Sequence, residues 1–119
     1  MSLPAFAPSA PFTLGVELEL QIVNSHDYDL TSGAADLLRL ASRRKFAADV
    51  KPEITSSMIE LSTAVCENHH QVLTQLREVR DALVDCANKL NLKLCGGGTH
   101  PFQDWSQQRI FDTARFRKV

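Results

Sequence analysis

Hydrophobic and polar residues alternate from residue 12 to residue 23, where the sequence reads FTLGVELELQIV. Every even position holds a large apolar residue, whereas the odd positions as far as Gln21 are polar or small. Strict alternation of this kind predicts a β-strand that buries one face against a core. The pattern therefore predicts a strand over residues 12–23 that carries two carboxylates, Glu17 and Glu19, on its polar face.

The spacing of these two carboxylates has a physical cost. Side chains two residues apart on a strand lie about 6.5–7 Å apart along one face. At an effective dielectric constant of about 20, two like charges at that distance repel each other by roughly 2–2.5 kcal/mol. Solvent or a bound cation relieves this repulsion, so Glu17 and Glu19 belong either to a solvated face or to a cation site.

A second alternating stretch covers residues 57–65, where Ile59, Leu61 and Thr63 alternate with positions that include Glu60. The pattern predicts a second strand with Glu60 on its polar or small-residue face. Paired strands lie about 4.8 Å apart, so pairing of the two strands would bring three carboxylates onto one patch. Glu53 lies on the approach to this strand, and an exposed loop carboxylate is its simplest interpretation.

The clearest helical pattern in the chain starts near Asn68 and continues to Leu90. Asn68 is a favourable N-cap, with Gln71 three residues later. Apolar residues at alternating spacings of four and three predict a stripe that packs against the sheet. The stripe consists of Val72, Leu76, Val79, Leu83, Cys86 and Leu90.

Weaker patterns complete the expected order of elements. Thr31, Ser32 or Gly33 is expected to begin a shorter helix, and Pro52 cannot continue a helix through its own position. The remaining segments are a helix over residues 31–45, a connector over 47–52, a short strand over 92–95 and a helix from Ser106 onward.

Composition narrows the class of protein. The chain has 119 residues, of which 44% are hydrophobic and 23% charged, as is usual for one globular domain. Its net charge of −1 argues against nucleic-acid binding, and no apolar run reaches the roughly 20 residues of a membrane helix. Residues 1–11 lack the basic start of a secretory signal and are expected to be a flexible leader to a domain over residues 12–119.

The cysteines and the glycine-rich loop add two further expectations. Three cysteines without CxxC spacing predict free thiols in a reducing cytoplasm rather than disulfides or a zinc site. The segment GGGTHPF, residues 96–102, follows the predicted third strand. Glycines at a strand end let a ligand or another backbone approach closely, although a flexible bend explains them equally well.

Several motifs stand in an order and at spacings that resemble one family. They are GVELEL at residues 15–20, Glu53 followed by ELST at residues 60–63, the long helix, and GTHPF at residues 98–102. Together they resemble the N-terminal part of the type 2 glutamate–cysteine ligases, also called carboxylate–amine ligases, over nearly all of the chain from Phe12 to about Phe116. Family chains are several times longer than this one, so the resemblance implies a fragment.

This resemblance implies an α+β fold, glutamine-synthetase-like, with an antiparallel sheet and helices packed on one face. It implies an ATP-dependent ligase that forms an amide through an acyl phosphate, with Mg²⁺ or Mn²⁺ as cofactor and ATP and an amino acid as substrates. No catalytic residue is assigned, and the fragment alone is expected to be inactive. By resemblance, Glu17, Glu19 and Glu60 bind metal, and the substrate-binding residues are Glu53, Thr63, Thr99 and His100.

Two other functional classes remain open. One is a non-catalytic module that binds only a metal or a partner, and the other is a metal-dependent hydrolase that uses the same acidic patch. A sheet cut from a larger one has an unpaired edge strand that invites pairing with another chain. Because two-fold pairing is the commonest arrangement of identical chains, a homo-oligomer is expected.

Overall fold

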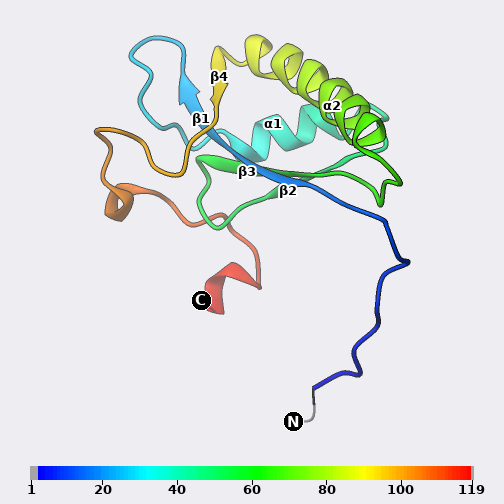
Figure 1. Cartoon of the computed structure of the whole chain (residues 1–119). Coiled ribbons are helices and arrows are strands. Elements are labelled where there is room, and N and C mark those ends of the chain that lie inside the picture. The colour runs from blue at the N-terminus through cyan, green and yellow to red at the C-terminus, as the bar shows by residue number, and fades with distance from the viewer. Residues whose placement is uncertain (1–2, 119) are drawn as a thin grey trace.

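The computed structural model describes residues 3–118; Met1, Ser2 and Val119, the outermost residues of the predicted leader and domain, lie outside the described part. The described chain forms a four-stranded antiparallel sheet in the order β2-β3-β1-β4, accompanied by two α-helices (Figure 1). The predicted α+β class with an antiparallel sheet is confirmed. The elements are β1 (Glu17–Asn24), α1 (Ala34–Ala41), β2 (Asp49–Pro52), β3 (Met58–Ser62), α2 (His69–Lys89), β4 (Leu92–Cys95) and the 3-10 turns η1 (Trp105–Gln107) and η2 (Phe116–Lys118).

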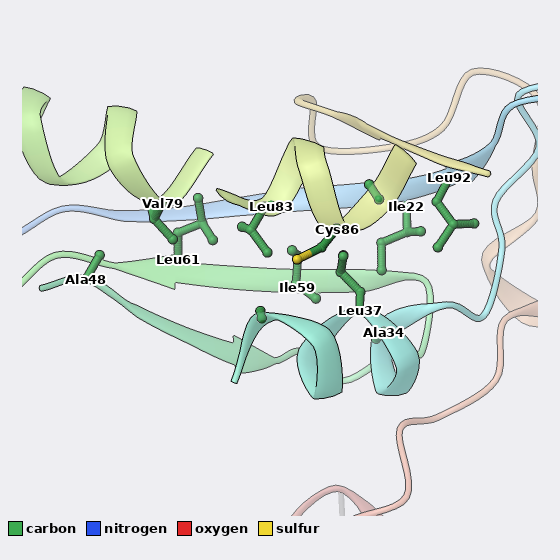
Figure 2. Close-up of a cluster of buried hydrophobic side chains, with 12 residues drawn as sticks. Ile22, Ala34, Leu37, Ala48, Ile59, Leu61, Val79, Leu83, Cys86 and Leu92 are labelled. Atoms are coloured by element: carbon green, nitrogen blue, oxygen red, sulfur yellow. The ribbon is translucent and has the colours of Figure 1, made fainter. Parts of the chain in front are cut away.

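The apolar positions of the two central strands share one face of the sheet. In the β1–β3 register Leu18 lies opposite Leu61 and Leu20 lies opposite Ile59. Both helices pack on this face, and Figure 1 shows them on one side of the sheet while the chain after β4 passes on the other side. The predicted packing of helices on one face is therefore confirmed. Figure 2 shows the resulting core, which includes Ile22, Ile59, Leu61 and Leu92 from the sheet, Ala34 and Leu37 from α1, and Val79, Leu83 and Cys86 from α2.

Helix α2 follows its sequence pattern closely. The Asn68 side chain accepts a hydrogen bond from the Gln71 N–H, which satisfies one of the free donors at the helix start. Asn91 takes a left-handed conformation with φ 55°, a common way to end a helix with asparagine. The predicted N-cap and helix end are both confirmed. Of the predicted stripe, Val72, Val79, Leu83 and Cys86 are buried, whereas Leu76 and Leu90 are half-buried.

Strand β1 is shorter than the alternation predicts, because it begins at Glu17 rather than at residue 12. Phe12 has φ 61°, which no strand residue adopts, and Leu14 forms only an isolated bridge to Cys66. Strand β3 is likewise shorter than predicted and ends at Ser62. The alternation of apolar and polar residues in the sequence thus continues beyond the hydrogen-bonded part of the β1–β3 pair. The excess lies before Glu17 and after Ser62, at the same end of the sheet.

The predicted connector over residues 47–52 is wrong for its last four residues, which form the edge strand β2. Four residues give too short a pattern to show alternation, and Pro52 disfavours a strand interior. An edge strand tolerates proline, because a missing N–H costs nothing on a side without a neighbour. Pro52 also occupies the last position of the strand, opposite Ile59.

The two other helix predictions are too long. Helix α1 has Gly33 as its N-cap, one of the three predicted starts, but beyond Ala41 the chain turns with an Arg44 N–H bond to the Ala41 carbonyl. The helix predicted from Ser106 is wrong, since only η1 and η2 form there. Tertiary contacts replace it, because the Phe111 N–H bonds to the Ile54 carbonyl on the β2–β3 connection.

Three smaller expectations concern the leader, the thiols and membrane helices. Residues 3–10 are exposed and contain neither helix nor strand; their flexibility stays a prediction. The cysteines are free, with Cys66 and Cys86 buried, as predicted. Among the helices of the described residues, none has the length and apolar character needed to cross a membrane.

Candidate functional site

The sheet face opposite the helices carries the predicted carboxylates. In the register of β1 and β3, Glu19 lies directly opposite Glu60 and Glu17 lies opposite Ser62. Because side chains alternate along a strand, these residues point away from the face that bears Leu18 and Leu61. The predicted convergence of Glu17, Glu19 and Glu60 on one face is confirmed, and these three residues are called the acidic strip below.

The hydrogen-bond pattern shows how close the central pair of the acidic strip is. The Ile22 N–H donates to the Ser57 carbonyl, and the Thr63 N–H donates to the Val16 carbonyl. Even-numbered β1 residues therefore form the hydrogen-bonded pairs, and Glu19 and Glu60 fall between them. Residues in such non-hydrogen-bonded pairs have Cα atoms about 4.5 Å apart, with their side chains closer than in the other pair type. Like charges in this arrangement repel each other and favour a nearby cation.

A lysine that the sequence analysis missed supplies one such cation. Lys51 of β2 lies opposite Glu60, and its Nζ is 3.5 Å from Glu60 Oε1 and 3.0 Å from Ser62 Oγ. The Ser62 hydroxyl also donates to Glu60 Oε1 at 2.9 Å. Sequence reasoning misses Lys51, because it predicts a connector over residues 47–52. The four residues of β2 are too few to show alternation, so no sequence pattern placed Lys51 on the polar face.

The acidic strip has the donor chemistry of a site for a hard divalent cation, because Mg²⁺ prefers carboxylate oxygens. Its side chains are not gathered into such a site, however. Nowhere in residues 3–118 do three acidic, histidine or cysteine side chains come together in a group that could hold a metal ion. Glu60 is instead turned to Lys51, and Glu17 and Glu19 are exposed. The three carboxylates would therefore have to move closer together to bind one ion.

A pocket of about 520 Å³ adjoins the acidic strip. Its floor includes Gln21 and Met58, which lie opposite each other, one step along the same face from Glu19 and Glu60. Its wall is the segment after β4, which contains the predicted substrate residues Thr99 and His100. The segment after β4 contributes Gly98, Thr99, His100, Pro101, Phe102, Gln103, Asp104, Trp105 and Gln108, and Leu30, Thr55 and Ser57 complete the lining.

Contacts distant in sequence hold the wall of this pocket in place. His100 Nε2 is 2.9 Å from the Tyr28 carbonyl oxygen, and the Phe102 ring stands edge-on to the His100 ring. On the opposite side the buried Ser57 hydroxyl donates to Gln108 Oε1 at 2.9 Å. Sequence reasoning missed Ser57 and Gln108, and no local pattern could have paired residues so far apart. The segment after β4 is thus anchored at His100 and again at Gln108.

Asp104 places a carboxylate in the pocket wall. It is the N-cap of η1, and hydrogen bonds from the Ser106 N–H, then from the Ser106 hydroxyl, lower the pKa of its carboxyl below the ordinary 3.8. The group is therefore ionised at neutral pH. A carboxylate in this position is suited to bind a cationic group of a ligand, such as an ammonium.

The other two predicted substrate residues lie outside the pocket. Glu53 Oε2 accepts a hydrogen bond from the N–H of its neighbour Ile54, just after β2. Thr63 Oγ1 accepts one from the Val16 N–H and so joins the two segments that extend β1 and β3. Both side chains have local structural roles here, and their predicted contact with substrate stays a prediction.

Comparison with known proteins places these features in a family. The sequence model of "Glutamate-cysteine ligase family 2 (GCS2)" matches residues 13–119. The chain belongs to this family. The resemblance that the motifs suggested is therefore confirmed over nearly the whole chain.

Three relatives agree with this assignment, and each bears the name "Putative glutamate--cysteine ligase 2". This chain is 64% identical over 119 residues to the protein of Leptothrix cholodnii, covering all of this chain and 32% of that protein. It is 59% identical to the Paraburkholderia phytofirmans protein, covering 98% of this chain and 32% of that one. For the Azoarcus protein the identity is 60%, covering 98% and 31%. The chain thus spans about a third of the length of these relatives, which confirms the predicted N-terminal fragment.

One solved structure resembles part of the fold. It is a C-terminal segment of the α subunit of aIF2 from Pyrococcus abyssi, with a TM-score of 0.45 and 12% sequence identity, covering 74% of this chain and 52% of that one. A similarity of this size carries no argument about function. The glutamine-synthetase-like architecture stays a prediction.

Proposed function

We propose that this chain is the N-terminal part of an ATP-dependent carboxylate–amine ligase of the glutamate–cysteine type, and that its acidic strip binds Mg²⁺ or Mn²⁺. The observation that carries the proposal is the placement of Glu19 directly opposite Glu60, on a sheet face that neither α-helix of the described chain covers, beside a pocket. Membership of the ligase family supports the reaction class. A cytoplasmic location is part of the proposal, because the three thiols are free.

The acidic strip and the pocket have separate tasks in this proposal. Glu17, Glu19 and Glu60 would hold the metal ion, which neutralises charge on the phosphates of ATP when it is bound. Preorganised charges of this kind act by electrostatic stabilisation and positioning rather than by covalent chemistry.

The pocket would bind the amino-acid substrate next to the metal. The Asp104 carboxylate is suited to its α-ammonium group, and the Gln21 amide on the floor is suited to a polar end. Thr99 and His100 would line the substrate site through the loop, as the family resemblance implies. Because floor and acidic strip share one face, a substrate carboxylate bound over Gln21 would lie toward the metal.

Metal binding by the chain tests this proposal directly. We expect calorimetric titration with Mn²⁺ to show binding that Glu19→Gln and Glu60→Gln each weaken by about tenfold or more, since even residues that only support metal ligands contribute about 10- to 100-fold. Glu78→Gln is the matched control, because Glu78 is exposed on α2, which packs on the other face. Equal affinities in all three variants would reject the acidic strip as the metal site.

Catalysis by the isolated chain is a separate question. We expect no amino-acid-dependent ADP release from the 119-residue chain, because it spans about a third of its relatives and electrostatic stabilisation of the transferred group needs more residues than the acidic strip. The same assay on a chain of the relatives' full length should show release that Glu19→Gln abolishes. ADP release by the short chain that is also lost in Glu19→Gln would show that the short chain is sufficient.

The second candidate is a module that binds metal or a partner without catalysis. The observation that favours it is again the short span of the chain relative to its relatives. It predicts that the truncated chain binds a metal or a partner as a stand-alone module, whereas the first candidate predicts a reading frame that continues into the rest of the ligase. The reading frame of the gene beyond residue 119 therefore separates the two candidates.

A further inference from the structure

We propose that Lys51 is a built-in counter-ion that holds Glu60 in the metal-free chain and releases it when a divalent cation binds. This inference rests on the proposed function, because it assumes that Glu60 is a metal ligand. Beyond the proposed function, it identifies Lys51 as the group with which the metal ion would compete for Glu60. Lys51 would thereby set the affinity of the site without touching the substrate.

The contacts around Glu60 carry the inference. Lys51 and Ser62 both approach the same carboxylate oxygen, Oε1, at 3.5 Å and 2.9 Å, and the Lys51 ammonium also bonds to Ser62 Oγ at 3.0 Å. The three groups form a closed triangle on the polar face. Glu60 is thus held toward β2, whereas Glu19 lies on its other side, across the β1–β3 pair.

Burial explains why Glu60 needs a partner that the other two carboxylates do not need. The Glu60 side chain is only 18% exposed, whereas Glu17 and Glu19 are exposed. A largely buried carboxylate is costly unless a counter-charge or hydrogen bonds compensate it. The like charge of Glu19 directly across the strands adds to this cost. In the absence of metal, Lys51 and Ser62 supply the compensation.

The chemistry of lysine suits a partner that can leave. The Lys51 side chain is 44% exposed, so its ammonium can turn into water, where it is strongly hydrated. A divalent ion bound by Glu60 and Glu19 would repel the ammonium and replace its charge. The bound ion and Lys51 would therefore compete for the charge of one carboxylate, and removal of the lysine charge should favour the ion.

The decisive experiment compares two variants that each remove one positive charge. We expect Lys51→Met to bind Mn²⁺ about 3- to 10-fold more tightly than the unmodified chain in calorimetric titration, because a partly exposed ion pair and one unit of charge repulsion are removed together. Lys93→Met is the control, since Lys93 is an exposed cation on β4, at the other edge of the sheet. Lys51→Arg keeps the charge and should not tighten binding. Lys51→Gln is a second neutral variant in case the methionine disturbs folding.

A double variant shows whether the effect passes through Glu60. In a Glu60→Gln background, Lys51→Met should no longer raise the affinity for Mn²⁺, because the contested carboxylate is gone. Carbon-13 NMR gives a readout independent of affinity. Titration with Mg²⁺ should shift the Glu60 carboxylate resonance and the Lys51 Cε resonance together, and the Lys93 Cε resonance should stay unchanged.

The outcomes separate this inference from the proposed function. Binding of Mn²⁺ that is equal in Lys51→Met and Lys93→Met would overturn the role of Lys51 and leave the metal site standing. Weaker binding in Lys51→Met would overturn it too, and would show that the lysine supports the site. No binding in any variant would reject both the metal site and the role of Lys51.

Discussion

The two faces of the sheet are built from the same strands and have opposite properties. On the apolar face, Ile22, Ile59 and Leu61 are at most 1% exposed and two helices cover them. On the polar face, Glu17 and Glu19 are exposed, and the segment that walls the pocket covers part of this face. Alternation along a strand thus separates stability from chemistry, because neighbouring residues contribute to different faces.

The comparison also explains where charge can accumulate. A pair of carboxylates directly opposite each other weakens a sheet. The apolar contacts on the reverse side of the same strands offset this cost, since burial of a large aliphatic side chain contributes about 1.5–3 kcal/mol. The sheet can therefore hold an unfavourable arrangement of charge in place. Substitutions on the two faces should accordingly have different consequences.

The largest expected effect belongs to the apolar face. Leu83→Ala on α2 should lower the free energy of unfolding by about 2–5 kcal/mol, because Leu83 is fully buried and its truncation leaves a cavity. Its neighbour Val84 is 43% exposed, so Val84→Ala should cost less than about 1 kcal/mol. Urea denaturation measures both. Similar costs for the two variants would contradict the placement of the core between α2 and the sheet.

The alternation in the sequence was sufficient to predict which face the β1 side chains from Glu17 to Ile22 and the β3 side chains occupy, because the period of two is fixed by the strand itself. The N-cap and stripe of α2 were predictable for the same reason, as both depend on nearby residues. Strand β2 was not predictable, since four residues ending in Pro52 carry little pattern. Because β2 was not predicted, Lys51 was not among the predicted site residues.

The pocket was predictable only in part. Its loop could be recognised from the glycines and the GTHPF motif, so Thr99 and His100 were found. The hydrogen bond between Ser57 and Gln108 could not be found, because it joins residues far apart in the sequence. Nor could the sequence show that Glu53 and Thr63 bond to backbone N–H groups instead of facing the pocket. Local patterns determine faces and helix ends, whereas tertiary contacts determine which loops meet.

The next largest expected effect is on self-association, and it concerns the unpaired part of β1. The polar and the apolar face of the sheet meet at this free edge. Strand β4 pairs with β1 only at residues 21–24, so within the described chain residues 17–20 have no strand on that side. An apolar pocket of about 360 Å³, partly lined by Leu18 and Leu73, lies beside this edge. We expect the chain to form a dimer at micromolar concentration by pairing at this edge.

Sedimentation equilibrium measures the dimer. Leu18→Lys should dissociate it, because the charge would lie in the apolar pocket. Two-fold pairing would also bring Glu17 and Glu19 of both copies side by side, so the dimer should strengthen when salt screens their repulsion. A single species of 13.2 kDa at all concentrations would disprove this association.

A smaller effect of opposite sign is expected on the polar face. Glu19→Gln should raise the free energy of unfolding by about 0.2–1 kcal/mol at low salt, because it removes a like charge directly opposite Glu60. The same variant should weaken Mn²⁺ binding. Thermal denaturation at low and high salt, with Glu78→Gln as control, measures the gain and its screening. A loss of stability in Glu19→Gln would mean that the carboxylate is stabilised by contacts within the fold, and the contrast between the two faces would be weaker than described.

The smallest effect concerns the wall of the pocket and is local. Hydrogen bonds from Ser106 hold the pKa of the Asp104 carboxyl below 3.8, so its stabilising contribution is present above that pH and is lost as the pH falls through the lower pKa of the folded state. Trp105, the single tryptophan of the chain, is the next residue and reports on this turn. We expect its fluorescence to change as the pH falls below 3.8 while the circular dichroism of the helices is unchanged.

Two variants assign this transition. Asp104→Ala should abolish the change in Trp105 fluorescence, because the variant has no carboxylate to cap η1. Asp27→Ala is the matched control: the pKa of Asp27 is also lowered, by hydrogen bonds from the Asp29 N–H and from Asn24, but it lies in the turn after β1. A transition that survives in Asp104→Ala would have to arise elsewhere. Loss of the helical signal at the same pH would show that the pocket wall and the helix-covered face unfold together, so that the two faces of the sheet are not independent.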